Sequence, residues 1–163
     1  MTATTTFAEL LKELADAFEQ CTRADGETRY YKLKDDCPDW IDSDMMLDVH
    51  RALDDRFPDD WVYESAAGIA DDLEAYDVED ADDARERMPD IADSQVDMYY
   101  HDQNRWLASH LGNAEFCEEA RENGIVGPES TMSERIVAGQ YIALERIGIA
   151  LIEAVESELE IRD

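Results

Sequence analysis

The sequence is poor in positive charge. Its 163 residues contain 14 Lys and Arg, of which three are lysines, against 42 Asp and Glu, and the formal net charge is −28 at pH 7. A net charge of about 2 to 8 is enough to keep a small domain soluble. Because like charges repel, the excess destabilises the compact state. Nucleic acid and anionic membranes are therefore not expected as direct ligands.

Cysteine is also scarce. Cys21, Cys37 and Cys117 are odd in number and none forms a CxxC pair. Neither a disulfide framework nor a zinc site is expected, and a reducing cytoplasm suits such a chain.

Long apolar runs are missing as well. The longest apolar stretch, 136–152, is interrupted by Gln140, Glu145 and Arg146, and the N-terminal segment carries acids where a signal peptide would be basic and then apolar. The sequence therefore predicts a cytoplasmic protein without a membrane span or a signal peptide.

Motifs that identify an enzyme or a metal site are lacking. There is no GxSxG or GxxxxGK pattern, and none of the three histidines has a Glu three residues before it. A calcium loop starting at Asp77 would place Asp82 where glycine is needed and Met88 where glutamate is needed. Carboxylates three residues apart are frequent, but 42 acids produce such pairs by chance. We predict a non-catalytic protein with no metal and no cofactor.

What the chain has in abundance is carboxylate, and it is unevenly distributed. Residues 1–34 have a net charge of −1, residues 35–102 carry 24 acids and four bases (net −20), and residues 103–163 have a net charge of −7. Adaptation to high salt would coat the whole surface with carboxylates. A concentrated anionic patch instead indicates a cationic partner.

The densest segment is 71–90, with ten carboxylates and two arginines. Residues three or four apart on a helix have Cβ atoms about 5–6 Å from one another. Helical geometry would thus align carboxylates in rows such as Asp80, Asp83 and Glu86. We predict that partner-binding residues lie here and in the preceding acidic pairs: Asp54, Asp55, Asp59, Asp60, Asp71, Asp72, Glu74, Asp77, Glu79, Asp80, Asp82, Asp83, Glu86 and Asp90.

The amount of charge fits imitation of nucleic acid. Duplex DNA carries one charge per roughly 1.7 Å of axis, so twenty charges correspond to about 34 Å. A compact domain of this length has a diameter of about 40 Å. The sequence therefore predicts a nucleic-acid-mimicking inhibitor that occupies the DNA- or RNA-contacting surface of a basic protein. Such proteins are typical of phages and mobile elements, where they act against restriction or CRISPR systems.

Two other interpretations remain open. One is an acidic, salt-adapted domain with an enzymatic or regulatory role, whose carboxylates serve hydration only. The other is an acidic chaperone for a basic protein.

The apolar pattern predicts a single all-α domain, a compact bundle of about five to seven helices. Thr6 and Glu9, and again Thr131 and Glu134, have the spacing of a capping box. One short β element is allowed near 28–34, and Pro89 is expected to end a short helix. The expected helices span 7–21, 43–56, 59–76, 80–88, 95–111, 113–122 and 131–159.

The last of these helices is apolar on nearly every side. A helix of this kind is buried rather than wet on one face, so it is expected at the centre of the bundle. Small residues in this helix permit close approach of another helix: Ala138, Gly139, Ala143 and Gly148. A homodimer contact through one flank of the helix is also allowed.

Overall fold

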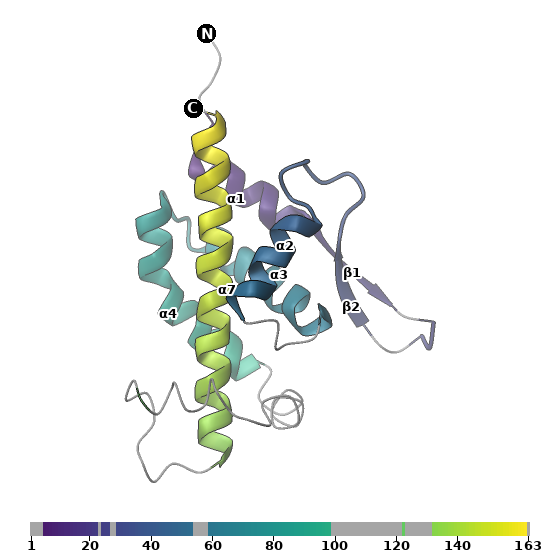
Figure 1. Ribbon diagram of the computed structural model, residues 1–163, viewed down its shortest axis with the longest axis vertical. Coiled ribbons are helices and arrows are strands. Elements are labelled where there is room, and N and C mark those ends of the chain that lie inside the picture. Colours follow the sequence, from purple (N-terminus) through teal and green to yellow (C-terminus); the bar gives the residue numbers. More distant parts are fainter. Residues whose placement is uncertain are drawn as a thin grey trace.

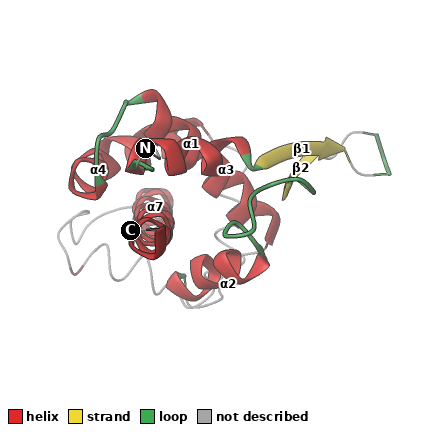
Figure 2. Ribbon diagram, turned by 90° about the horizontal axis from the view of Figure 1, so that it is seen from above, coloured by secondary structure: helices red, strands yellow, loops and turns green. Residues whose placement is uncertain are grey.

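The computed structural model describes residues 5–22, 24–26, 29–53, 59–98, 122 and 132–162 (Figure 1). These residues form five helices and one antiparallel pair of strands. The prediction of a mostly helical domain is confirmed. The prediction of an all-α fold is wrong, because the strand pair projects from the helical body as a hairpin (Figure 2).

The first helix, α1 (Phe7–Asp16), begins at the predicted cap, where Thr6 Oγ1 accepts a hydrogen bond from the Glu9 backbone N–H at 3.2 Å. It ends five residues earlier than predicted. The chain continues as β1 (Phe18–Thr22), which pairs with β2 (Arg29–Leu33) so that Phe18 is opposite Leu33. The helical pattern of 17–21 is thus overridden by the pairing of β1 with β2.

The hairpin is held to the helices at its base. Phe18 is buried and meets the ring of Tyr63 edge-on, with ring centroids 6.4 Å apart. The connection between the strands includes Gly26, whose φ of 75° is one that glycine adopts readily. The extended element predicted near 28–34 is confirmed as β2.

Two helices follow the hairpin. Helix α2 (Ser43–Ala52) is capped by Asp42, whose Oδ1 accepts from the Met45 N–H at 2.9 Å. Helix α3 (Asp59–Ala75) matches its predicted range within one residue. Helix α2 ends at Ala52 with Leu53 as its C-cap, before the predicted end at residue 56, and residues 54–56 lie outside the described residues.

Helix α4 (Ala81–Met98) continues through Pro89, so the predicted helix end at this proline is wrong. Proline removes one backbone hydrogen bond and usually bends a helix, and α4 is not straight in Figure 1. The buried residues Met88, Ile91 and Ala92 on both sides of Pro89 hold the helix together by packing. The first residues of the helix predicted over 95–111 form the end of α4, and the rest of that helix lies outside the described residues. The helix predicted over 113–122 also lies outside them, apart from residue 122.

The C-terminal helix α7 (Met132–Arg162) has 31 residues and confirms the long helix predicted over 131–159. At 1.5 Å per residue it is about 46 Å long. It contacts α1, α2, α3 and α4, most extensively α4. Within the described ranges, no helix combines the length and the apolar character needed to cross a membrane.

One contact between α4 and α7 involves Gly148. A Cβ atom at this position would overlap the Sδ and Cε atoms of Met88, which is itself buried. The missing side chain is therefore what lets Met88 reach the surface of α7. Around this contact lies an apolar core shared by all five helices, which includes Leu14, Ile69, Ile91 and Ile147.

A double-mutant cycle tests this contact. Gly148→Ala should destabilise the wild-type protein by about 1–3 kcal/mol through overpacking, despite the better helix propensity of alanine. In a Met88→Ala background the new methyl group has room, so Gly148→Ala should be at least about 0.5 kcal/mol less damaging there. Urea unfolding of the four proteins measures both values. Equal effects in the two backgrounds would contradict the contact.

Candidate functional site

Helix α4 has two chemically different faces. Ala84, Met88, Ile91 and Gln95 are buried on the inner face. The opposite face carries four exposed carboxylates, which we name the outer row: Asp82, Glu86, Asp90 and Asp93. Their spacing of four, four and three residues places neighbours about 5–6 Å apart over about 16 Å of axis. Asp93 was not among the predicted residues, although its helical spacing from Asp82, Glu86 and Asp90 was readable in the sequence.

A second group of predicted carboxylates lies at the end of α3, near α1. Asp71 is exposed and Glu74 is half-buried, one turn apart. Partial loss of hydration raises the pKa of Asp71, and the negative charges of Glu74, Asp72 and Asp16 raise it further. The ionised form of Asp71 is thus disfavoured relative to an isolated aspartate, because its hydration is partly lost and negative charge is concentrated where α3 and α1 meet.

Asp77, predicted to bind a partner, forms the turn just after the end of α3. Its φ of 53° is in the left-handed region, and its N–H donates to the Glu74 carbonyl at 3.0 Å. This is the conformation usual just past a helix end, where Asp is tolerated better than most residues. Its side chain is exposed, so the residue contributes charge as well as a turn.

Two of the predicted partner-binding carboxylates cap α4 instead. Asp80 Oδ1 accepts from the Asp83 N–H at 2.8 Å, and Asp83 Oδ2 accepts from the Glu79 N–H at 3.1 Å. This reciprocal arrangement satisfies N–H groups at the helix start. Two members of the predicted row of Asp80, Asp83 and Glu86 therefore also act as caps, whereas no capping contact engages Glu86 among the described residues.

Asp72 is also engaged internally. Its Oδ2 accepts from Nε2 of the buried Gln95 at 2.7 Å, which joins α3 to α4. Gly68 makes this possible, because a Cβ there would lie 2.8 Å from Gln95 Oε1. Among the described residues, that Oε1 atom has no hydrogen-bond partner.

The two arginines of the segment are both paired. Arg85 lies between Asp82, at 3.4 Å, and Glu156 of α7. Arg87 is 3.7 Å from Asp83, and its guanidinium carbon lies 5.7 Å from the centre of the Tyr76 ring. These contacts leave Glu86, Asp90 and Asp93 without an ion pair to any described residue.

Tyr76 is an exposed aromatic residue inside the acidic segment. It is 44% exposed and lies in the turn between α3 and α4. Its position past the end of α3 is the signal that only the structure supplies.

The negative potential of the outer row extends to α7. Burial raises the pKa of the Tyr141 hydroxyl, and the neighbouring charges of Glu145, Asp93 and Asp90 raise it further. Asp90 and Asp93 therefore lie close enough to Tyr141 of α7 for their charges to act on its hydroxyl group.

The other predicted residues are not placed. Asp54 and Asp55 lie outside the described residues. Asp59 and Asp60 belong to the first turn of α3, but their side chains are not described.

Exposed carboxylates are not confined to α3 and α4. Further ones occupy α1, the segment before α2, α2 itself and α7: Glu9, Asp16, Asp35, Asp36, Asp39, Asp44, Asp48, Glu153 and Glu160. In the described part of the chain, no group of three or more His, Cys, Asp or Glu residues is arranged to hold a metal ion. What distinguishes the outer row is that four exposed carboxylates follow one face of a single helix at spacings of three or four residues.

Substitutions at Asp80 distinguish the contribution of its capping hydrogen bond to stability from the contribution of its charge. Asp80→Ala should destabilise the protein by about 1 kcal/mol, because the cap of α4 is lost. Asp80→Asn also removes the charge but keeps an oxygen acceptor, so its stability should stay close to wild type. Urea unfolding measures both. If Asp80→Asn loses as much as Asp80→Ala, the contribution of Asp80 is electrostatic and the capping role is wrong.

No family model matches this chain, and no curated protein or solved structure is significantly similar to it.

Proposed function

We propose that the protein is a non-catalytic inhibitor that binds the nucleic-acid-contacting surface of a basic partner protein and presents the outer row in place of phosphates. The observation that carries this proposal is the placement of Asp82, Glu86, Asp90 and Asp93 on one exposed face of a helix whose other face is buried.

The spacing of the outer row supports the comparison with nucleic acid. Its four carboxylates cover about 16 Å, a length over which one DNA strand presents about five phosphates at 3.4 Å each. The charge density is therefore slightly lower than that of a single strand. Glu79, exposed just before α4, extends the row at its N-terminal end.

Rigidity supports the proposal as well. A carboxylate competes with a phosphate only if it is already positioned, because ordering a mobile side chain or segment costs binding energy. Met88 and Ile91 anchor the inner face of α4 in the core, and Asp80 and Asp83 hold its first turn. We further propose that α7 is the central helix of a compact single-domain bundle, and that this bundle holds α4 rigid.

The contacts with the partner follow from the chemistry of carboxylates. Arginine and lysine side chains that normally bind phosphates would pair with the outer row, and arginine can do so with two parallel hydrogen bonds. Tyr76 would add an apolar contact at the edge of the charged area, since aromatic residues are frequent anchors of protein interfaces. Binding to the partner then excludes DNA or RNA by competition.

The expected setting is the cytoplasm of a cell invaded by a phage or mobile element, with a restriction or CRISPR protein as the basic partner. No cofactor, metal or direct nucleic-acid contact is part of this mechanism. A homodimer through α7 is compatible with it, because the outer row belongs to α4.

A capture experiment with charge-matched variants tests the proposal. Immobilised wild-type protein should retain a nucleic-acid-binding protein from host lysate at low salt, and duplex DNA should displace it. The triple variant Glu86→Gln, Asp90→Asn, Asp93→Asn should lose retention and show a weaker dependence on salt, because fewer ion pairs form.

The control is a triple variant with the same change in net charge, Asp35→Asn, Asp36→Asn, Asp39→Asn, at three exposed positions before α2. It should retain the partner like the wild type. Equal losses in both triple variants would mean that only total charge matters. A captured protein that DNA fails to displace would contradict competition.

Salt adaptation is the second candidate function of the carboxylates, and their presence on α1, α2 and α7 as well as on α4 favours it. The two explanations predict opposite responses to salt. A mimic should remain folded below about 50 mM salt and should release its partner as salt rises. Circular dichroism across a salt series measures the first response. Loss of helical signal at low salt would support salt adaptation and count against mimicry.

A further inference from the structure

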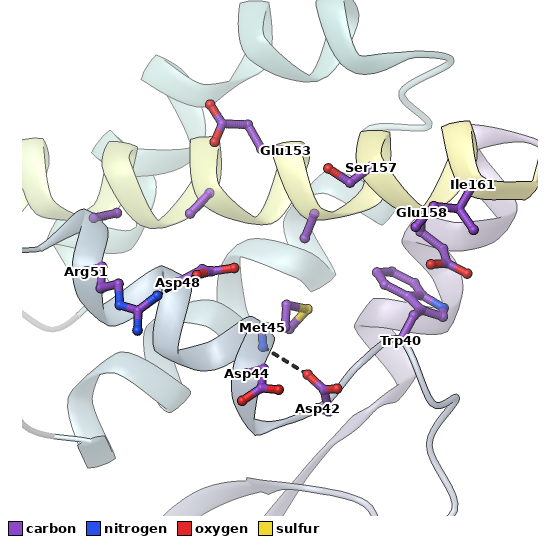
Figure 3. Close-up of a pocket in the computed structure, with 13 residues that line it drawn as sticks. Trp40, Asp42, Asp44, Met45, Asp48, Arg51, Glu153, Ser157, Glu158 and Ile161 are labelled. Carbon is purple, nitrogen blue, oxygen red and sulfur yellow. Dashed lines mark hydrogen bonds and ion pairs between the residues drawn. The ribbon is translucent and has the colours of Figure 1, made fainter.

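A groove of about 670 Å³ lies between α2 and the C-terminal part of α7 (Figure 3). It is separate from the outer row, since α2 and α4 lie on different sides of α7 (Figure 2). The acidic pattern of the sequence did not identify it, because its walls come from segments about 100 residues apart.

The floor of the groove is apolar and made mostly of small side chains. Met45 and Ala52 of α2 face Ala150 and Ala154 of α7. At one end lie Trp40 and Ile161, which point toward the same space in Figure 3. Ile161 is 77% exposed, the most exposed large apolar side chain among the described residues.

The rim of the groove is acidic. Five carboxylates and one arginine, Arg51, line it, which gives a local net charge of −4. The carboxylates come from both helices: Asp42, Asp44, Asp48, Glu153 and Glu158. Asp48 is 3.4 Å from Arg51, whereas Asp44 and Glu153 have no ion-pair partner among the described residues. The groove thus offers apolar contact between two lines of negative charge.

The Trp40 end of the groove is held in place by a polar network. Trp40 Nε1 donates to Glu13 Oε2 at 3.4 Å, and Arg162 lies 3.8 Å from Glu13. Arg162 Nε also donates to Glu158 Oε1 at 3.0 Å. These contacts tie the end of α7 to α1 and to the segment before α2, so this end of the site is formed before a ligand binds.

The dimensions suit a helix. The lining residues run from Ala150 to Ile161 on α7, about 16 Å, and α2 with its ten residues is about 15 Å long. Both lengths correspond to about three helical turns. A helix that fills such a groove places apolar side chains at positions i, i+3, i+4 and i+7 on the floor and polar ones along the rim.

We propose that this groove binds a basic amphipathic helix of a partner protein. Its leucine-like side chains would contact Met45, Ala150 and Ala154, and its Lys and Arg side chains would pair with Asp44, Asp48 and Glu153. Complementary charge selects this occupant. A second copy of the chain would bring a further net charge of −28 to an acidic rim, which opposes self-association. The inference does not depend on the function proposed for the outer row.

The experiment uses the full chain and a fluorescein-labelled probe peptide of about 14 residues, roughly four turns, with leucines on one helical face and lysines and arginines on the other. Fluorescence anisotropy at about 150 mM salt should show saturable binding. A peptide of the same composition in scrambled order should bind at least tenfold more weakly, because it cannot present one apolar face. Equal binding of both peptides would reduce the effect to unspecific charge attraction and overturn the proposal.

Variants locate the binding site. Asp48→Asn with Glu153→Gln changes only exposed rim residues and should weaken peptide binding several-fold. Ala154→Trp should block the floor and weaken it more than tenfold. The matched control, Asp35→Asn with Asp36→Asn at two exposed positions outside the groove lining, removes the same charge and should leave the affinity within about twofold.

Circular dichroism and urea unfolding of each variant show whether it folds. Ala154 packs partly against the core, so the rim variant decides the question if Ala154→Trp unfolds. Unchanged binding in the folded rim variant, or equal weakening by the matched control, would overturn the assignment to this groove. The probe peptide contains no nucleic-acid-binding domain. A failure of the peptide to bind the groove would therefore not contradict the function proposed for the outer row, which the capture experiment tests.

Discussion

The packing of α4 against α7 is the contact on which the proposed surface depends. Gly148 lacks a side chain where Met88 approaches α7, and Ile91 continues the same buried face of α4. Once this face is buried, helical geometry leaves Asp82, Glu86, Asp90 and Asp93 on the outside. The arrangement of charge on α4 is thus a consequence of apolar packing on its opposite side.

The cost of concentrating charge is met in two ways. Two like charges about 6 Å apart repel by roughly 0.7 kcal/mol in water and about 3 kcal/mol near a protein surface. Burial of one large apolar side chain such as Met88 or Ile91 contributes about 1.5–3 kcal/mol, which is comparable to the repulsion of one such pair near the surface. In addition, Asp80 and Asp83 cap a helix, and Arg85 links Asp82 to Glu156. Some carboxylates of segment 71–90 therefore stabilise the fold, whereas the others destabilise it through charge repulsion.

The outer row and the α2–α7 groove would recognise cations differently. The outer row is charged, and among the described residues Tyr76, in the turn before α4, is the one exposed aromatic residue near it, so its binding would be governed by steering and by salt. The groove combines an acidic rim with an apolar floor of Met45, Ala150 and Ala154. A ligand there loses apolar surface to burial as well as gaining ion pairs, which makes its binding less dependent on salt.

Local patterns in the sequence determined α1 at its capped start, α3, the long α7, and the concentration of acids in the middle of the chain. They failed at residues 17–21, where pairing with β2 replaces helix, and at Pro89, where packing of Met88 and Ile91 against the core carries α4 through the proline. They did not reveal that Asp72, Asp80 and Asp83 accept internal hydrogen bonds, since a sequence does not show which carboxylates turn toward backbone N–H groups or a buried Gln95. The groove was decided by tertiary structure alone, because it exists only where α2 and α7, distant in the chain, come together.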